Sequence, residues 1–210
     1  SRKVVRTVKV LREPKSAVFS KDGKYMFVTN FLPAQRADLD YVAACVSVIE
    51  MDGFTKVKDI QLANGSNALR GICITPDGKY IYFTSDRGGN PQIYRKPVVG
   101  GSAERISFGN AYAISPAVSP KNDQVAYIVR TGGHFKLVQQ DLATGNVIPL
   151  SEIGKNESPS YSPNGNMIIY ASEVGGKGVL STVSTDGSTR SRLSGTSGDI
   201  REPSWGPTIK

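Results

Sequence analysis

The chain of 210 residues is long enough for one sizeable core or for an array of small units, and 39% of its residues are apolar. Its apolar runs are too short to span a membrane, and its net charge of +8 leaves nucleic-acid binding open as a function. The two cysteines, Cys45 and Cys73, lie in apolar runs without metal-ligand spacing, so we expect buried free thiols and no disulfide.

The first expected element is a strand at 4–11, VVRTVKVL, because apolar and polar residues alternate there. Residues 1–24 hold eight Lys and Arg against two acidic residues, which a nucleic-acid binder could also show. Lysines on the outer face of an edge strand discourage aggregation, and no aromatic stacking platform accompanies the charge. We therefore expect an edge strand and no nucleic-acid partner.

One pattern then recurs along the chain: a short strand, a turn similar to Ser/Thr-Pro-Asp-Gly, and a second apolar strand. Proline, aspartate or asparagine, and glycine each favour such turns. The copies lie at 17–30, 72–85, 117–129 and 160–172, and a truncated copy ends the chain at 203–207. A repeat of about 40–45 residues with four short strands per unit is typical of β-propeller blades.

The repeat predicts an all-β fold: a β-propeller with four complete four-stranded blades and a partial blade built from both termini. The complete blades are expected at 14–63, 69–108, 115–151 and 158–194. The first is longer because it contains the loop 31–44. The partial blade would combine 4–11 with 202–205, and all 210 residues would form a single domain.

Residues from about 83 to 207 resemble the C-terminal propeller of the TolB family. The resemblance rests on FTSDRGGNPQIYR, SPAVSPKNDQVAYI, FKLVQQDLATG, ESPSYSPNGNMIIYAS, GKGVLSTVSTDG and REPSWGP. In that family the propeller has six blades, follows an α/β domain that contacts TolA, and receives the lipoprotein Pal. The resemblance implies a periplasmic location.

Residues 1–80 instead resemble YVTN-type surface-layer or YncE-like propellers, through FVTN and VSVIEMDGFTKVKDIQL. Both families share text similar to PDGKYIYF, so a crossover there would preserve the turn and both strands. We therefore interpret 79–83 as a seam between a YVTN-like part at 1–80 and a TolB-like part at 81–210. An engineered or recombined chimera is expected, and a natural hybrid from domain shuffling is the alternative.

Catalytic signals are weak. His134 is a lone loop histidine, no Gly-x-Ser-x-Gly elbow occurs, and no second histidine could complete a triad. Asp38 and Asp40, near Arg36, lack the further spaced ligands of a calcium loop. The Gly88-Gly89 pair precedes a strand rather than a phosphate-binding helix. We expect no enzyme activity, no metal and no cofactor.

The remaining candidate is the rim of the propeller channel, which the residues just before each inner strand should line. These are Arg12, Glu13, Asn67, Arg70, Tyr112, Ser115, Asn156, Glu157, Ser158, Arg201 and Glu202. The TolB resemblance implies a partner-binding surface at Tyr112, Ser115, Glu157, Ser158, Arg201 and Glu202. The alternative is that the charges neutralise each other around a water-filled channel.

Three functions are compatible with this sequence. The leading hypothesis is a non-catalytic propeller scaffold, a chimera that retains no parental activity. The alternative is a periplasmic protein-interaction module with residual TolB-like binding of Pal, and the third is an enzyme that uses the channel. Two ways to cover the open strand edges are left open: one chain closes on itself by pairing 4–11 with 202–205, or two chains join through their terminal edge strands as a homodimer.

Overall fold

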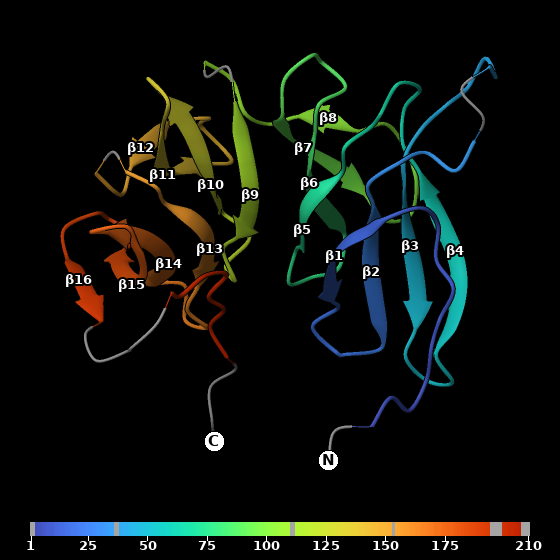
Figure 1. Cartoon of the computed structure of the whole chain (residues 1–210), viewed down its shortest axis with the longest axis horizontal. Coiled ribbons are helices and arrows are strands. Elements are labelled where there is room, and N and C mark those ends of the chain that lie inside the picture. The colour runs from blue at the N-terminus through green and yellow to red at the C-terminus, as the bar shows by residue number, and fades with distance from the viewer. Residues whose placement is uncertain (1–2, 36–37, 110–111, 153, 194–198, 207–210) are drawn as a thin grey trace. The chain divides into compact units, whose positions relative to one another are not determined.

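A computed structural model describes residues 3–35, 38–109, 112–152, 154–193 and 199–206 (Figure 1). Within these ranges the chain has sixteen strands and no helix. The strands form four antiparallel sheets of four strands each, which is the architecture of β-propeller blades. The predicted all-β class with four complete blades is therefore confirmed. Within the same ranges, no helix is long and apolar enough to cross a membrane.

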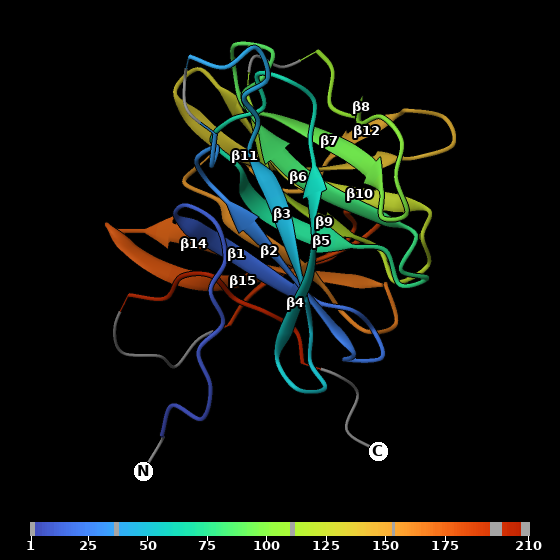
Figure 2. The same cartoon turned by 90° about the vertical axis from the view of Figure 1, so that its right-hand side faces the viewer.

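The chain divides into two compact units, Ser1–Ile106 and Ser107–Lys210. Unit 1 contains two sheets, with strand orders β1-β2-β3-β4 and β5-β6-β7-β8, and Figure 2 shows β1 to β4 side by side. The strands are β1 (Pro14–Phe19), β2 (Tyr25–Asn30), β3 (Cys45–Glu50), β4 (Thr55–Gln61), β5 (Arg70–Ile74), β6 (Tyr80–Ser85), β7 (Gln92–Pro97) and β8 (Glu104–Arg105).

Unit 2 also contains two sheets, with strand orders β12-β11-β10-β9 and β13-β14-β15-β16. The strands are β9 (Ala113–Val118), β10 (Gln124–Thr131), β11 (His134–Asp141), β12 (Val147–Pro149), β13 (Glu157–Tyr161), β14 (Met167–Val174), β15 (Lys177–Ser184) and β16 (Arg190–Leu193). The last strand is the shortest of its sheet in three of the four sheets. These short strands are β8, β12 and β16, with two, three and four residues.

The turn between the first two strands is built in the same way in three sheets. After β1, the Ser20 hydroxyl donates to Asp22 Oδ1 at 2.6 Å, and the Lys24 N–H donates to the same oxygen at 3.1 Å. Thr75 and Asp77 repeat these bonds after β5, and Ser162 and Asn164 repeat them after β13. Ser/Thr and Asx side chains thus replace backbone partners and fix the hairpin, as the sequence predicts.

Each unit has its own apolar core between its two sheets. The core of unit 1 includes Phe27, Val48, Ile81, Phe83 and Tyr94. The core of unit 2 includes Ala126, Ile128, Leu137, Tyr161, Ile168 and Val183. Both cysteines are free; Cys45 is buried, as predicted, whereas Cys73 is only half-buried. Burial raises the pKa of the Cys45 thiol to about 11.

A backbone irregularity recurs where the first strand of each sheet begins. In unit 2 the pairs Ser115–Pro116 and Ser158–Pro159 each lie opposite a single residue of the second strand, which is a β-bulge. Ser115 and Ser158 have φ of 55° and 52°, in the left-handed region that non-glycine residues rarely adopt. Glu202, which also precedes a proline, has φ of 51°; Glu13 and Ala68 have the same φ but lie before β1 and β5 begin, outside the bulges of these strands.

The two terminal segments differ from the prediction. Residues 4–11 form no strand, and Val4 and Val5 are 85% and 84% exposed. Residues 202–205 form no strand either, although the Trp205 N–H donates to Ser160 Oγ at 3.2 Å. A strand needs a hydrogen-bonded neighbour, and the described part of the chain provides none for 4–11, whatever its apolar alternation.

Candidate functional site

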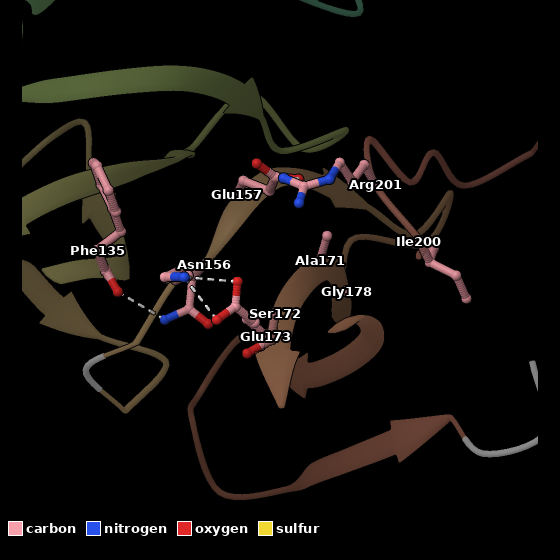
Figure 3. Close-up of a pocket in the computed structure, with 10 residues that line it drawn as sticks. Phe135, Asn156, Glu157, Ala171, Ser172, Glu173, Gly178, Ile200 and Arg201 are labelled. Atoms are coloured by element: carbon pink, nitrogen blue, oxygen red, sulfur yellow. Dashed lines mark hydrogen bonds and ion pairs between the residues drawn. The ribbon is translucent and has the colours of Figure 1, made fainter. Parts of the chain in front are cut away.

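The six predicted rim residues all belong to unit 2. Tyr112 and Ser115 lie at the start of β9, Glu157 and Ser158 open β13, and Arg201 and Glu202 lie in the segment 199–206 that follows β16. The structure brings two of them together directly, because Arg201 Nη1 lies 3.6 Å from Glu157 Oε1. Figure 3 shows both side chains at the edge of one pocket.

This pocket, which we call the rim pocket, has a volume of about 200 Å³. It is lined by Phe135, Lys155, Asn156, Glu157, Ala171, Ser172, Glu173, Gly178, Ile200 and Arg201. A second ion pair lies beside the first, with Lys155 Nζ 2.7 Å from Glu173 Oε1. The Arg201 side chain is 59% exposed and that of Glu157 is 38% exposed, so both charges are accessible to a partner.

The segment 199–206 is fixed to unit 2 through Gly178 on β15. The Gly178 N–H donates to Asp199 Oδ1 at 2.6 Å, and the Ile200 N–H donates to the Gly178 carbonyl at 3.1 Å. A Cβ at Gly178 would overlap the backbone of Ile200, so only glycine allows this approach. Asp199 in turn accepts from Arg201 Nε at 3.0 Å and thereby orients the guanidinium.

The same contacts lower the pKa of the Asp199 carboxyl group. The hydrogen bond from the Gly178 N–H, followed by that from Arg201, holds the pKa of Asp199 below its ordinary value. Asp199 is therefore a positioning residue that the sequence-based list of rim residues missed. A glycine inside the predicted strand GKGVLS was the available signal, since glycine within a strand often marks close backbone approach.

Asn156 has a structural position at the base of the rim. Only 4% of it is exposed, and its Nδ2 lies 2.8 Å from the Phe135 carbonyl, 3.0 Å from Ser151 Oγ and 2.9 Å from the Glu152 carbonyl. These bonds hold the chain that leads into Glu157, and Figure 3 shows the one to the Phe135 carbonyl. Asn156 therefore positions Glu157 and does not itself face a partner.

Tyr112 reaches the rim pocket through Phe135. Their rings meet edge to face with centroids 6.2 Å apart, and the Arg130 guanidinium lies 4.7 Å from the Tyr112 ring centre. Ser115, Ser158 and Glu202 share the left-handed backbone described above rather than one contact with each other. The rim of unit 2 thus consists of one ion-paired pocket with an aromatic wall.

The rim residues predicted in unit 1 make their contacts within that unit. Arg12 Nη1 donates to the Pro33 carbonyl at 3.3 Å, and the Arg70 guanidinium lies 5.3 Å from the Phe31 ring centre. The Asn67 carbonyl accepts from the Ser85 hydroxyl at 3.4 Å. These three residues therefore contact other parts of unit 1 through their side chains or backbone.

The other candidates gain no chemical role. His134 is an exposed residue at the start of β11, and Arg36 lies outside the described residues. The backbone around Asp40 is held by Asn64, whose amide donates to the Asp40 carbonyl at 2.8 Å. Across the described ranges, no group of three or more His, Cys, Asp or Glu side chains is placed to hold a metal.

Comparison with known proteins identifies the repeat. The family model described as the TolB beta propeller domain matches residues 47–209. The Tol-Pal system protein TolB of Nitrosospira multiformis is 54% identical over 117 residues, which are 54% of this chain and 27% of that protein. The protein of the same name from Methylobacillus flagellatus is 56% identical over 82 residues, 39% of this chain and 19% of that protein.

A solved structure extends the similarity to almost the whole chain. The crystal structure of TolB from Acinetobacter baumannii covers 99% of this chain with 34% identity and a TM-score of 0.75. The alignment takes in 49% of that protein, so this chain spans about half of it, and smaller shares of the two curated relatives.

These matches overturn the interpretation of residues 79–83 as a seam. The TolB match begins at residue 47, inside the supposed YVTN-like part, and continues through 79–83. The turn at Thr75 also has the same hydrogen bonds as the turn at Ser162 in the TolB-like part. The prediction of an engineered or recombined chimera is therefore wrong. The chain belongs to the TolB beta-propeller family.

Proposed function

We propose that the chain is a protein-interaction module of the Tol-Pal system that acts in the periplasm and binds a Pal-like lipoprotein. Its proposed binding surface is the rim formed by Tyr112, Ser115, Glu157, Ser158, Arg201 and Glu202. Members of the TolB family are non-enzymatic Tol-Pal components, so the chain is not an enzyme, as the sequence predicts. A single propeller domain over residues 1–210 is part of this proposal.

One observation carries the proposal: the accessible ion pair between Glu157 and Arg201 at the edge of the rim pocket. An exposed pair at 3.6 Å contributes little to stability, so a partner can replace it at little cost. Charges placed in this way add specificity and speed to association more than they add affinity. The fixed segment 199–206 holds one of the two charges in place before a partner arrives.

The test is isothermal titration calorimetry of the whole chain with the soluble domain of Pal from the same organism. Arg201→Glu should weaken binding at least about tenfold, since it places one negative charge beside that of Glu157 and removes a donor. Arg192→Glu is the matched control, because Arg192 is exposed on β16 of the same unit, away from the rim pocket. Equal affinities for the two variants, or no binding by the unaltered chain, would contradict the proposal.

A charge exchange separates the internal ion pair from the contact with Pal. The double variant Glu157→Arg, Arg201→Glu restores attraction between the two side chains, but it removes the donor to Asp199, so its unfolding free energy should lie slightly below that of the unaltered chain. It should not restore Pal binding, because each position that faces the partner would carry the opposite charge. Recovery of full affinity would mean that the pair acts only within unit 2.

A further inference from the structure

Three cationic side chains of unit 1 gather at the short segment 31–33 that follows β2. Lys15 lies on β1, Arg70 opens β5, and these two strands lie against each other. Lys15 Nζ and Arg70 Cζ are each 5.3 Å from the centre of the Phe31 ring. Arg12 reaches the same segment, where its Nη1 donates to the Pro33 carbonyl at 3.3 Å. We call Arg12, Lys15 and Arg70 the unit 1 cation cluster.

The Phe31 ring holds two of these side chains in place. The Phe31 N–H donates to the Glu13 carbonyl at 2.8 Å, which ties the ring to the chain that enters β1. A cation near an aromatic ring is attracted by the quadrupole of the ring. Phe31 is half-buried, whereas all three members of the cluster are exposed. The ring therefore limits where Lys15 and Arg70 lie and leaves both open to a ligand.

The positive charge of the cluster is not neutralised within the protein. Among the described residues, none of the three cations is ion-paired with a carboxylate. The acid next to them in the sequence is Glu13, and three positive charges against this one negative charge leave a net charge of +2. Like charges held near one ring repel each other, and a bound anion would relieve that repulsion.

The rim of unit 2 shows the opposite arrangement. There Arg201 Nη1 lies 3.6 Å from Glu157 Oε1, and Arg201 Nε lies 3.0 Å from Asp199 Oδ2. Lys155 Nζ is likewise paired with Glu173 Oε1 at 2.7 Å. Cations near the first strands are thus compensated by acids in unit 2, whereas those of the unit 1 cation cluster are not.

The hydrogen-bond donors of the cluster are also unused. Within the described ranges, the side chains of Lys15 and Arg70 donate no hydrogen bond, and Arg12 donates one through Nη1. A lysine side chain has three N–H donors, an arginine side chain has five, and neither has an acceptor. The cluster therefore offers many donors to a ligand that brings several anionic oxygens.

A phosphate monoester matches this set of groups better than a carboxylate does. It carries a charge of about −1.5 to −2 at pH 7 and three strong acceptor oxygens, whereas a carboxylate has one charge and two oxygens. The guanidinium fork of arginine binds phosphate oxygens in pairs, and lysine adds a compact positive charge. A dianion would also balance the net charge of the cluster and Glu13.

We propose that the unit 1 cation cluster binds the phosphate monoester group of a soluble ligand. Arg12 and Arg70 donate to the phosphate oxygens, Lys15 adds positive charge, and Phe31 keeps Lys15 and Arg70 in position. This site lies in unit 1 and does not depend on Pal binding by the rim of unit 2.

The probe is methyl phosphate, titrated at pH 7.5 into the whole chain labelled with nitrogen-15 and followed by NMR. Saturable shifts of the amide signals are expected at 12–16, 30–31 and 70–71. Dimethyl phosphate, a diester with a single charge, and acetate should each bind at least about tenfold more weakly. Absence of methyl phosphate binding, or equal binding of the monoester and the diester, would overturn the proposal.

Variants of the protein test the residues. The double variant Lys15→Gln, Arg70→Gln should weaken methyl phosphate binding at least about tenfold. The matched control is Lys177→Gln, Arg192→Gln, which removes the same charge from two exposed residues of unit 2 and should leave binding unchanged. Phe31→Leu should weaken binding about threefold although it removes no charge, because it removes the ring that holds the two cations.

Further measurements keep the outcome clear. Circular dichroism melting checks that each variant is folded, and equal weakening by the two double variants would overturn the proposal, since only net charge would then matter. Binding to vesicles that contain phosphatidic acid, without binding to methyl phosphate, would overturn it too, because the ligand would then be a lipid surface. Arg201→Glu should bind methyl phosphate as the unaltered chain does, so this proposal and that for the rim can fail separately.

Discussion

Single side chains set the geometry of the repeated turns, and their identity was readable from the sequence. In the hairpin between β15 and β16, Asp186 accepts hydrogen bonds from the Ser184 hydroxyl and from the N–H and hydroxyl of Ser188. These bonds lower the pKa of Asp186 to about 2. Turn composition predicts such bonds because they form between residues two to four apart, whatever the rest of the fold does.

Asp186 should therefore make stability depend on pH in the acid range. A pKa of about 2 in the folded chain lies below the usual value of about 3.9 in an unfolded chain, so the contribution is complete above about pH 4. It is lost as the pH falls toward 2. Urea unfolding at pH 5 and at pH 2.5 should show a smaller acid loss for Asp186→Asn than for the unaltered chain.

Asn164 provides the converse test, because it holds the same place in its turn and accepts the same kinds of hydrogen bond. Asn164→Asp should add acid sensitivity of the same sign. An acid loss that is unchanged in both variants would show that these turn contacts do not stabilise the charged form.

At the scale of elements, alternation and turn residues located the sixteen strands well, but not the ends of the chain. Residues 4–11 alternate as a strand should, yet a strand also needs a neighbour, which lies outside the reach of local pattern. The bulges at Ser115 and Ser158 escaped prediction for a similar reason. Their left-handed backbone is imposed by pairing with the second strand, although each is marked by a following proline.

The bulge at Ser158 predicts opposite effects for two substitutions. Ser158→Val should lower the unfolding free energy by about 1–3 kcal/mol, since a β-branched residue tolerates φ of 52° poorly. Ser158→Gly should be neutral or stabilise by up to about 1 kcal/mol, because glycine adopts this conformation without strain. Chemical denaturation measures both values. A valine variant as stable as the glycine variant would contradict the assigned backbone.

The attachment of the segment 199–206 to β15 should depend on one glycine, Gly178. Gly178→Ala should lower the unfolding free energy by about 1–3 kcal/mol, because its methyl group would displace Ile200 and Asp199 from β15. Gly206→Ala is the control in the same segment, where a Cβ meets nothing within 4 Å. Amide exchange at Ile200 should accelerate in the first variant only. Unchanged exchange there would mean that the segment does not depend on this contact.

At the scale of the whole molecule, the sequence correctly indicated a β-propeller, but the prediction that the chain is a chimera of two families was wrong. Local text such as FVTN suggested a second parent for 1–80, whereas similarity to TolB covers 99% of the chain. Short turn and strand motifs follow from the structure of a blade. Many propeller families share that structure, so such motifs distinguish the families poorly. The candidate rim was partly predictable, because Glu157 and Arg201 open successive repeats. Asp199 and Gly178 were not, since their roles arise from a contact 21 residues apart.

Dimerisation through the terminal segments remains a prediction. Residues 4–11 and 202–205 lack strand partners in the described chain, and a second copy could supply them. Light scattering coupled to size exclusion should then give about twice 22.5 kDa, and removal of residues 1–11 should give a monomer. A mass of 22.5 kDa for the intact chain would contradict it.

The most direct test of the central claim, that the rim of unit 2 binds a Pal-like partner, is amide hydrogen exchange of the whole chain with and without the soluble domain of Pal. The account predicts protection on binding in three stretches: 112–115, 155–158 and 199–202. Protection that is absent from these stretches, or that is confined to the turns at 20–25 and 75–80, would contradict it.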